Sequence, residues 1–321
     1  MTIKKIGVLT SGGDGPGMNA AIRSVVRTGL AANIEVAGIM RGYQGLIDDE
    51  VIPMDHRSVS NIINRGGTIL KTARSKKFST PEGKDIAMAT LKKHAIDALV
   101  VIGGDGTYRG AVDLMARHHF PVVGVPGSID NDICGTDETI GCATAINTAL
   151  DSIDKIRDTA QSMERIFIIE VMGNQSGYIA LRVAMAAGAE TVIIPERTFD
   201  YKTLCTEIQD GNKRGKVNWI IVTAEGAAKA PDVAQSLTMM TGLQTRFVVL
   251  GHVQRGGSPV AADRLLATRL GSAAVELLLK GEYGKAVGIM NEKIHIVDLA
   301  QAVGHPDSRT DEYLHLMKLL S

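Results

Sequence analysis

The feature that most constrains the fold is a series of short runs that are apolar on consecutive residues. Strands covered by helices on both faces have this pattern, whereas strands with one wet face alternate apolar and polar residues. Segments with the 3.6-residue period of helices lie between the runs. The pattern predicts an α/β protein with doubly wound, mainly parallel sheets. We expect strands at Ile6–Leu9, Val36–Met40, Ala98–Ile102, Val122–Val125, Ile166–Val171, Thr191–Ile194, Trp219–Thr223 and Phe247–Leu250.

Two of the intervening helices can be outlined in detail. One has an apolar stripe of Ile22, Val25, Val26 and Leu30, and we expect Asn19 to cap its N-terminus. The other is expected over 144–161, where apolar residues recur at the same period. The chain has 321 residues, more than one hydrophobic core usually serves, so one large or two coupled domains are expected.

Charge and composition exclude several classes of partner. Thirty-five basic residues balance thirty-five acidic ones, so no long-range field attracts nucleic acid or an anionic membrane, and we expect neither as a partner. The first apolar run is too short for a signal peptide, and nothing approaches the ~18 apolar residues of a membrane span. Three cysteines without metal-ligand spacing favour reduced thiols in the cytoplasm.

Three glycine-rich loops follow predicted strands in the first half of the chain. They are "TSGGDGPGMN" (10–19), "GGDGTYRG" (103–110) and "PGSIDNDICGTD" (126–137). Parallel sheets bind ligands beyond the carboxyl ends of their strands, near helix N-termini that attract anions. Bare backbone with several carboxylates indicates a site for nucleotide phosphates and magnesium.

Each loop alone has a simpler interpretation. A single glycine-rich turn is more often a tight connection than a phosphate site, and Asp130 or Asp132 alone could form an Asx turn. The spacing of Gly104, Gly106 and Gly110 is one residue longer than the dinucleotide fingerprint. Three such loops in one half of the chain favour the phosphate site.

The motifs together resemble the bacterial-type ATP-dependent 6-phosphofructokinases. The segments that carry the resemblance, in the family's order and spacing, are "GVLTSGGDGPGMNAAIR", "VVIGGDGTYRGA", "GVPGSIDNDICGTD", "DKIRDT", "VMG" and "VLGHVQRGGSP". The resemblance implies two doubly wound three-layer (α/β/α) domains with the active site between them. The large nucleotide-binding domain would span 1–141 with 254–304, and the smaller sugar-phosphate-binding domain 142–253 with 305–321. It also implies a homotetramer.

The reaction that the resemblance implies is phosphoryl transfer from MgATP to the 1-hydroxyl of fructose 6-phosphate. Asp130 matches the general base, Arg74 the cation on the transferring phosphate, and Asp105 the carboxylate that holds magnesium. Ser128 and Asp132 lie in the same loop and are expected at the reacting centre. The remaining nucleotide contacts would be Gly13, Ser75, Gly104, Gly106 and Thr107.

Sugar binding in the family uses four basic residues on the 6-phosphate, the first two from a neighbouring subunit. Guanidinium groups suit a phosphate dianion because they donate paired, directed hydrogen bonds. The matching residues here are Arg165, Arg246, His252 and Arg255, with Met172, Gly173, Asn174 and Glu225 at the sugar. Asn174 replaces the family's usual arginine near the transferring phosphate, which raises the question of whether activity is reduced.

Two glycines bear on the phosphoryl donor. Pyrophosphate-dependent relatives carry aspartate after "GGD" and lysine before "TIDND", where this chain has Gly106 and Gly127. An aspartate would obstruct the α-phosphate and adenosine, so the resemblance favours ATP.

An effector site for ADP or phosphoenolpyruvate is also implied. The matching residues are Arg23, Arg27, Arg157, Glu190, Arg214 and Lys216. Departures cluster here, because His56, Arg57, Asn61 and Asn218 replace the family's more usual Arg, Tyr, Asp and His. A degenerate site that keeps only basic charge is therefore the competing hypothesis.

Two other functions compete with the phosphofructokinase assignment. "GGDGT" also marks NAD and diacylglycerol kinases, although these lack "GHVQRGG" and "PGSIDND". A non-catalytic phosphosugar or nucleotide sensor is suggested by Asn174, but a sensor has no need of the base Asp130.

Overall fold

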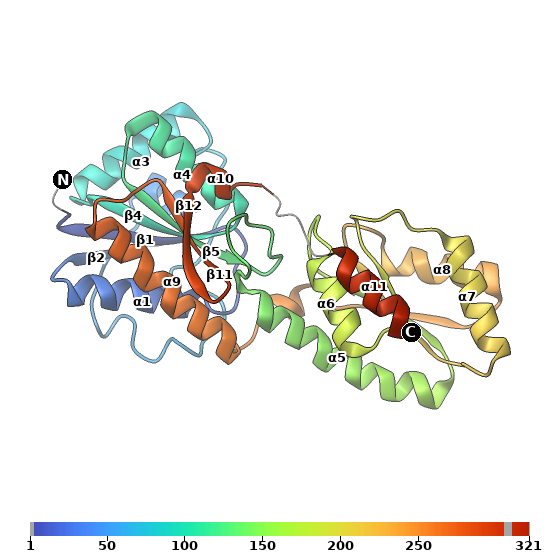
Figure 1. The fold of residues 1–321 in the computed structure, drawn as a ribbon. Coiled ribbons are helices and arrows are strands. Elements are labelled where there is room, and N and C mark those ends of the chain that lie inside the picture. Colours follow the sequence, from blue (N-terminus) through green and yellow to red (C-terminus); the bar gives the residue numbers. More distant parts are fainter. Residues whose placement is uncertain (1–2, 305–309, 321) are drawn as a thin grey trace. The chain divides into compact units, whose positions relative to one another are not determined.

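The computed structural model describes residues 3–304 and 310–320, and these form two compact units (Figure 1). The first unit consists of 3–144 and 255–304, and the second of 145–254 and 310–320. Residues 305–309 and 321, which the resemblance assigns to the smaller domain, lie outside the described residues. In the described part of the chain, no helix combines the length and apolar character that a membrane crossing requires.

The first unit is built on a sheet in the order β12-β11-β5-β4-β1-β2-β3, with the short β6 beside β5. Its central strands are parallel, and only the outer pairs β2–β3 and β11–β12 are antiparallel. The strands are β1 (Lys5–Ser11), β2 (Glu35–Ile39), β3 (Val51–Met54), β4 (Ala98–Gly103), β5 (Val122–Ser128), β6 (Ile140–Gly141), β11 (Lys285–Met290) and β12 (Lys293–Asp298).

Helices cover both faces of this sheet. Helices α1 (Met18–Ala31) and α9 (Ala261–Leu279) pack in one apolar cluster with Ile6, Val8 and Val100. The opposite cluster contains Leu9, Leu99 and residues of α2 (Tyr43–Asp48), α3 (Pro81–Lys93), α4 (Asp105–His118) and α10 (Leu299–Ala302). Successive strand residues point to opposite faces, so consecutive apolar residues fill both clusters.

Asn19 does not cap α1, contrary to our expectation. The N-cap is Gly17, at φ 105°, and Asn19 lies buried within the first turn. Its amide donates to the carbonyls of Arg65 and Gly66, and its Oδ1 accepts from the N–H of Ile69 at 2.8 Å. A cap residue and a buried side chain that bonds a distant loop are both polar at a helix start, so the sequence alone did not separate them.

The second unit has a four-stranded parallel sheet in the order β10-β7-β9-β8. Helices α7 and α8 share an apolar cluster with one face of the sheet, α6 contacts β8 and β9, and α11 packs on α6. The elements are α5 (Cys142–Met163), β7 (Ile166–Val171), α6 (Tyr178–Ala187), β8 (Thr191–Ile193), α7 (Tyr201–Lys213), β9 (Trp219–Ala224), α8 (Ala230–Thr241), β10 (Thr245–Val249), the 3-10 helix Gly251–Arg255 and α11 (Thr310–Leu320).

The two sheets confirm the predicted α/β class. Each of the eight apolar runs overlaps a strand, and α5 covers the helix expected over 144–161. The strands β3, β6, β11 and β12 were not predicted. Two of them, β3 and β12, are the outermost strands of the sheet. They have exposed residues and so lack a continuous apolar run.

Candidate active site

The three glycine-rich loops of the first unit follow adjacent strands. Ser11 at the end of β1 pairs with Gly103 at the end of β4, and Gly103 pairs with Pro126 in β5. Because these strands are parallel and in register, the loops that follow them leave the same edge of the sheet. This arrangement brings Gly13, Gly104–Thr107 and Ser128–Asp132 to one edge, as the sequence predicted for a phosphate site.

The first loop lies against an arginine that comes from the other end of the unit's sequence. A Cβ added to Gly13 would be 2.5 Å from Nη1 of Arg255, and this Nη1 donates to the carbonyl of Asp14 at 3.1 Å. Gly13 therefore cannot be replaced unless the guanidinium moves. The structure brings together one predicted nucleotide contact and one predicted sugar-phosphate contact.

The second loop leaves space beside its glycines. A Cβ at Gly106 would meet nothing within 4 Å, and one at Gly104 would meet nothing closer than 3.8 Å. Thr107 is buried, and no hydrogen-bond partner for its hydroxyl is found among the described residues. Open space beside bare backbone together with a buried, unused hydroxyl fits a loop that holds an oxygen-rich ligand.

Asp105 is the first residue of α4 and interacts on both carboxylate oxygens. Its Oδ2 accepts from Nε of Arg109 at 2.7 Å, and its Oδ1 accepts from the N–H of Gly304 at 3.1 Å. The side chain is about a quarter exposed, so it remains accessible to a ligand. Within the described ranges, no group of three or more His, Cys, Asp or Glu side chains is arranged to hold a metal.

The third loop buries its carboxylates. Asp130 is 7% exposed and Asp132 is 8% exposed. The hydroxyl of Ser128 donates to Asp132 Oδ1 at 2.8 Å and accepts from the N–H of Asp130 at 3.2 Å. Thr139 donates to the carbonyl of Ser128 at 2.6 Å, which holds the end of β5 in place. Ser128 thus bonds the carboxylate of Asp132 and the backbone of Asp130.

Arg74 and Ser75 lie in a loop that is tied to the same edge of the first sheet. The hydroxyl of Thr10 in β1 donates to the carbonyl of Lys71, and the hydroxyls of Thr10 and Thr68 are 2.9 Å apart. Ser75 Oγ accepts from the N–H of Phe78 at 3.2 Å. The Arg74 side chain is exposed, so a ligand can meet it without displacing a protein partner.

In the second unit, five predicted residues follow the carboxyl ends of β7, β9 and β10: Met172, Gly173, Asn174, Glu225 and His252. The backbone N–H of Asn174 donates to Oε1 of Glu225 at 3.1 Å. The N–H of Met172 donates to Oε1 of Gln254 at 2.8 Å. The sequence interpretation did not select Gln254, although it lies within the quoted "HVQRGG" motif and its complete burial marks it as structural support.

Arg165 and Arg246 lie at the opposite edge of this sheet. Arg165 directly precedes β7, and Arg246 is the second residue of β10, where Thr245 pairs with Ile166. Arg165 lies seven residues before Met172, about 23 Å at 3.3 Å per residue, and Arg246 pairs with Phe167, five residues or about 16 Å before Met172. One copy of this unit therefore does not bring these arginines to Glu225 and His252.

The predicted effector residues fall in both units. In the second unit, Lys216 Nζ lies 3.3 Å from Glu190 Oε1, and an Arg157 nitrogen donates to the carbonyl of Ala187 at 2.5 Å. Arg214 is the C-cap of α7. Arg23 and Arg27 lie on α1 of the first unit and are partly exposed.

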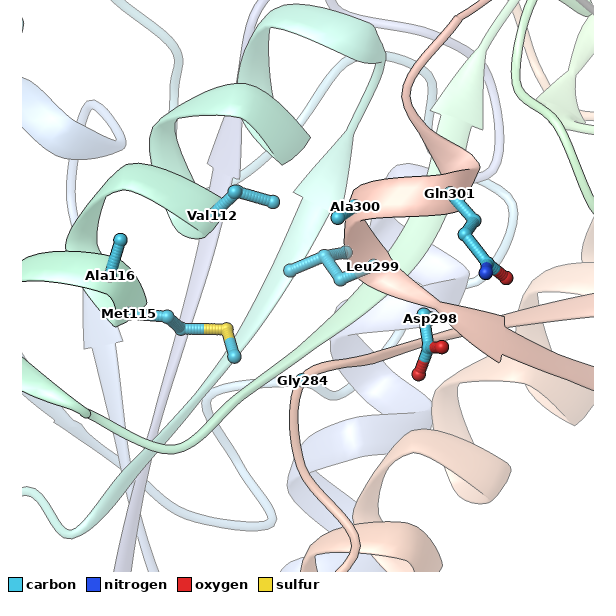
Figure 2. A pocket seen from close by; sticks show the side chains of 8 residues that line it. All are labelled: Val112, Met115, Ala116, Gly284, Asp298, Leu299, Ala300 and Gln301. Carbon is cyan, nitrogen blue, oxygen red and sulfur yellow. The ribbon is translucent and has the colours of Figure 1, made fainter.

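Two surface cavities lie away from the glycine-rich loops. The larger, about 490 Å³, is lined by Val112, Met115, Ala116, Gly284, Asp298, Leu299, Ala300 and Gln301, and Figure 2 shows its mainly apolar walls from α4 and α10. It contains none of the predicted residues. The smaller, about 230 Å³, lies in the second unit and contains one of them, Lys216. Neither cavity is lined by the predicted active-site residues. What connects those residues is the register of the strands that they follow.

Comparison with known proteins decides the family. The sequence model of the phosphofructokinase family matches residues 5–278. The chain belongs to the phosphofructokinase family. It is 48% identical to the ATP-dependent 6-phosphofructokinase of Halothermothrix orenii and 51% identical to that of Bacillus subtilis, in both cases over 99% of this chain and 100% of the relative.

A solved structure supports the same assignment. Phosphofructokinase from Saccharomyces cerevisiae matches 94% of this chain with a TM-score of 0.86 and 39% identity. The match covers 45% of the yeast chain, so this chain spans a little under half of that relative.

Proposed function

We propose that this protein is an ATP-dependent 6-phosphofructokinase. It transfers the γ-phosphoryl group of ATP to the 1-hydroxyl of fructose 6-phosphate, giving fructose 1,6-bisphosphate and ADP, which is a step of glycolysis. The observation that carries the proposal is the register of β1, β4 and β5, which gathers the glycine-rich loops and the buried Asp130 at one edge. Near-complete matches to bacterial relatives of that name support it.

In the proposed reaction, Asp130 accepts the proton of the sugar hydroxyl as the oxygen attacks. Burial beside Asp132 in a loop fixed by Ser128 supports this role, because a general base must be held within hydrogen-bond reach of its proton. Arg74 places positive charge on the transferring phosphoryl group, where charge spreads in the transition state.

The nucleotide binds against the glycine-rich backbone of the first unit, which we propose as the nucleotide-binding domain. Its contacts are Gly13, Ser75, Gly104, Gly106 and Thr107, and the open space at Gly106 supports ATP over pyrophosphate as donor. The second unit is proposed as the sugar-phosphate-binding domain, with Met172, Gly173, Asn174 and Glu225 at the sugar and Arg165, Arg246 and His252 at the 6-phosphate. Arg255, which belongs to the first unit, is proposed as the fourth contact of the 6-phosphate.

Magnesium fits the residues that are present. Mg²⁺ is usually held by one or two carboxylates together with substrate phosphates, so a single accessible Asp105 is an adequate protein ligand. The ion neutralises charge on the phosphate oxygens when it is bound. Arg109 forms an exposed ion pair with the Asp105 carboxylate, and we propose that this pair separates when the metal binds.

Assembly and regulation are also proposed, in a cytoplasmic setting. Arg165 and Arg246 lie at the far edge of their own sheet, which supports a homotetramer in which a neighbouring copy supplies them. ADP and phosphoenolpyruvate are the proposed effectors, bound by Arg23, Arg27, Arg157, Glu190, Arg214 and Lys216. The existing Glu190–Lys216 pair would have to open for a phosphate to reach that lysine.

A coupled assay of ADP release tests the proposal. The purified chain is supplied with MgATP and either fructose 6-phosphate, NAD, diacylglycerol or no acceptor. In a parallel series pyrophosphate replaces ATP, and formation of fructose 1,6-bisphosphate is measured because this donor releases phosphate and no ADP. Release that requires both ATP and fructose 6-phosphate supports the function. Release with NAD or diacylglycerol instead, or binding of sugar phosphate without turnover, would establish one of the competing functions.

A further inference from the structure

A lysine that the sequence motifs do not include lies within the proposed sugar-binding edge of the second unit. Lys229 is the N-cap residue of α8, but its side chain makes no capping bond. Its Nζ instead donates to the carbonyl of Glu225 at 3.0 Å and lies 3.3 Å from Oε1 of Glu170. Lys229 thus joins the end of β7 to the loop that follows β9.

Glu225 is held on three sides by this arrangement. Its N–H donates to the carbonyl of Val171, its carbonyl accepts from Lys229, and its carboxylate accepts from the N–H of Asn174. The backbone next to Glu225 is closely packed, because a Cβ on Gly226 would lie 2.0 Å from the Asn174 carbonyl oxygen. Among the described residues, Lys229 is the only one whose charged side chain is recorded in a hydrogen bond with Glu225.

Charge gives Lys229 a second effect. Glu170 is 5% exposed, and its Oε2 accepts from the N–H of Ala230 at 2.8 Å, at the first turn of α8. The helix N-terminus stabilises this carboxylate in part, and Lys229 supplies the full positive charge beside it. Without Lys229, the buried Glu170 would keep its helix N-terminal hydrogen bond but would lose the side-chain cation that balances its charge.

We propose that Lys229 is a positioning residue for substrate specificity: it fixes Glu225 for the sugar hydroxyls and balances the charge of Glu170. The inference rests on the proposed function, in which Glu225 contacts the sugar. Lys229 does not touch the reacting atoms, so it affects binding of the sugar and not the phosphoryl transfer step. This separation of KM from kcat is what a merely structural role would not produce.

Steady-state kinetics of three single variants test the role. Lys229→Met should raise KM for fructose 6-phosphate about fivefold, in the range of a partly exposed charged hydrogen bond, with kcat and KM for ATP within about twofold of wild type. Lys229→Arg should have a KM for fructose 6-phosphate close to that of wild type, because arginine keeps the positive charge and the hydrogen-bond donors. Lys213→Met is the matched control, since Lys213 forms an exposed pair with Asp210 in the same unit.

A double-variant comparison separates this inference from the proposed function. Glu225→Gln should itself raise KM for the sugar, and adding Lys229→Met to it should produce little further change, because the two residues act together. An unchanged KM in Lys229→Met, or a rise that adds in full to that of Glu225→Gln, overturns the positioning role while the proposed function stands. An unchanged KM in Glu225→Gln overturns the sugar contact itself, and with it the inference.

Discussion

The two sheets differ in how many of the predicted site residues lie together at the carboxyl ends of their strands. In the first unit, most of the predicted nucleotide and catalytic residues lie at the carboxyl ends of three adjacent strands. Asp130 and Asp132 are buried there, and Ser128 bonds the Asp132 carboxylate. In the second unit, Glu225 follows a strand end, whereas Arg246 lies at the beginning of a strand. Folding of one chain therefore gathers the first set of residues, whereas it leaves Arg165 and Arg246 apart from Glu225.

The difference has a topological cause. In a parallel sheet every strand starts at one edge and ends at the other, so a side chain before a strand cannot join side chains that follow strands in the same unit. Basic residues at a strand start remain available to another molecule. We therefore expect the first unit's residues to act within one chain, and Arg165 and Arg246 to act on a neighbouring copy.

Removal of the proposed base should have the largest effect. Asp130→Ala should lower kcat by about 10²–10⁴-fold, the usual range for a lost general base, with little change in KM for fructose 6-phosphate. Initial rates with both substrates saturating measure the change. Asp113→Ala is the control, because that aspartate is exposed on α4 and pairs with Lys84. Near-normal turnover of Asp130→Ala would contradict its assignment and the local completeness of the first edge.

The second expected effect concerns substrate affinity. Arg246→Ala should raise KM for fructose 6-phosphate roughly ten- to a hundredfold, since hydrogen bonds to charged groups contribute about 1.5–3 kcal/mol, with a smaller change in kcat. Sugar titrations at saturating ATP give both constants. Arg269→Ala, which removes an exposed arginine of the first unit, should leave both unchanged. Normal sugar affinity in Arg246→Ala would mean that the 6-phosphate binds elsewhere.

Mixed oligomers sharpen the comparison further. Inactive Asp130→Ala chains and weakly binding Arg246→Ala chains, dissociated and reassembled together, should recover activity if the two residues act across subunits. About a quarter of the sites in a random mixture would then contain both native residues. Recovery at limiting sugar is measured against each variant reassembled alone. Failure to recover, with assembly verified by sedimentation, would place both residues within one chain's site.

A stability prediction contrasts the first-turn aspartates of two helices. Asp263 in α9 is buried and accepts from the N–H groups of Gly141 and Thr144, each at 2.8 Å, whereas Asp232 in α8 is exposed. Asp263→Asn should lower the free energy of unfolding by about 1–3 kcal/mol. The amide has one oxygen and one NH₂ group, so it can accept from only one of the two backbone N–H groups and leaves the other unpaired. Asp232→Asn should cost less than about 1 kcal/mol. Urea unfolding at pH 7 measures both.

The same residue predicts a pH dependence. Burial raises the pKa of Asp263, opposed by hydrogen bonds from Thr144 and Gly141. The native protein therefore binds this proton more readily than the unfolded chain, so the carboxyl's contribution to stability grows as pH falls from 7 toward about 4. The difference in unfolding free energy between wild type and Asp263→Asn should widen over that range. A difference that narrows would show that the carboxylate form is favoured by folding.

The smallest expected effect is at the departure from the family motif. Asn174→Arg should raise kcat by up to about tenfold by restoring a cation at the transferring phosphate. Asn174 has φ 52°, a left-handed conformation that asparagine tolerates and arginine adopts at a cost of about 1–2 kcal/mol. Asn291→Arg, at φ 48° in the turn between β11 and β12, isolates that cost. Unchanged or reduced kcat at saturating substrates would mean that the charge is supplied elsewhere.

The sequence by itself predicted the buried parallel strands of both sheets and the positions of the glycine-rich loops that follow three of them. Consecutive apolar residues predicted the buried strands, and the glycine-rich loops that follow them placed Gly106 and Asp130 at strand ends, because both signals are local in the chain. It did not predict that Asn19 bonds a distant loop, since a polar residue at a helix start reads as a cap.

Only the tertiary structure decided which loops meet. The pairing of β11 with β5 joins segments far apart in the chain, and no local pattern encodes that register. The contact of Lys229 with Glu170 likewise joins residues 59 positions apart, and the separation of Arg246 from Glu225 depends on strand direction. These relations follow from packing of whole elements, because the free energy that fixes them comes from burial across the sheets rather than from neighbours in sequence.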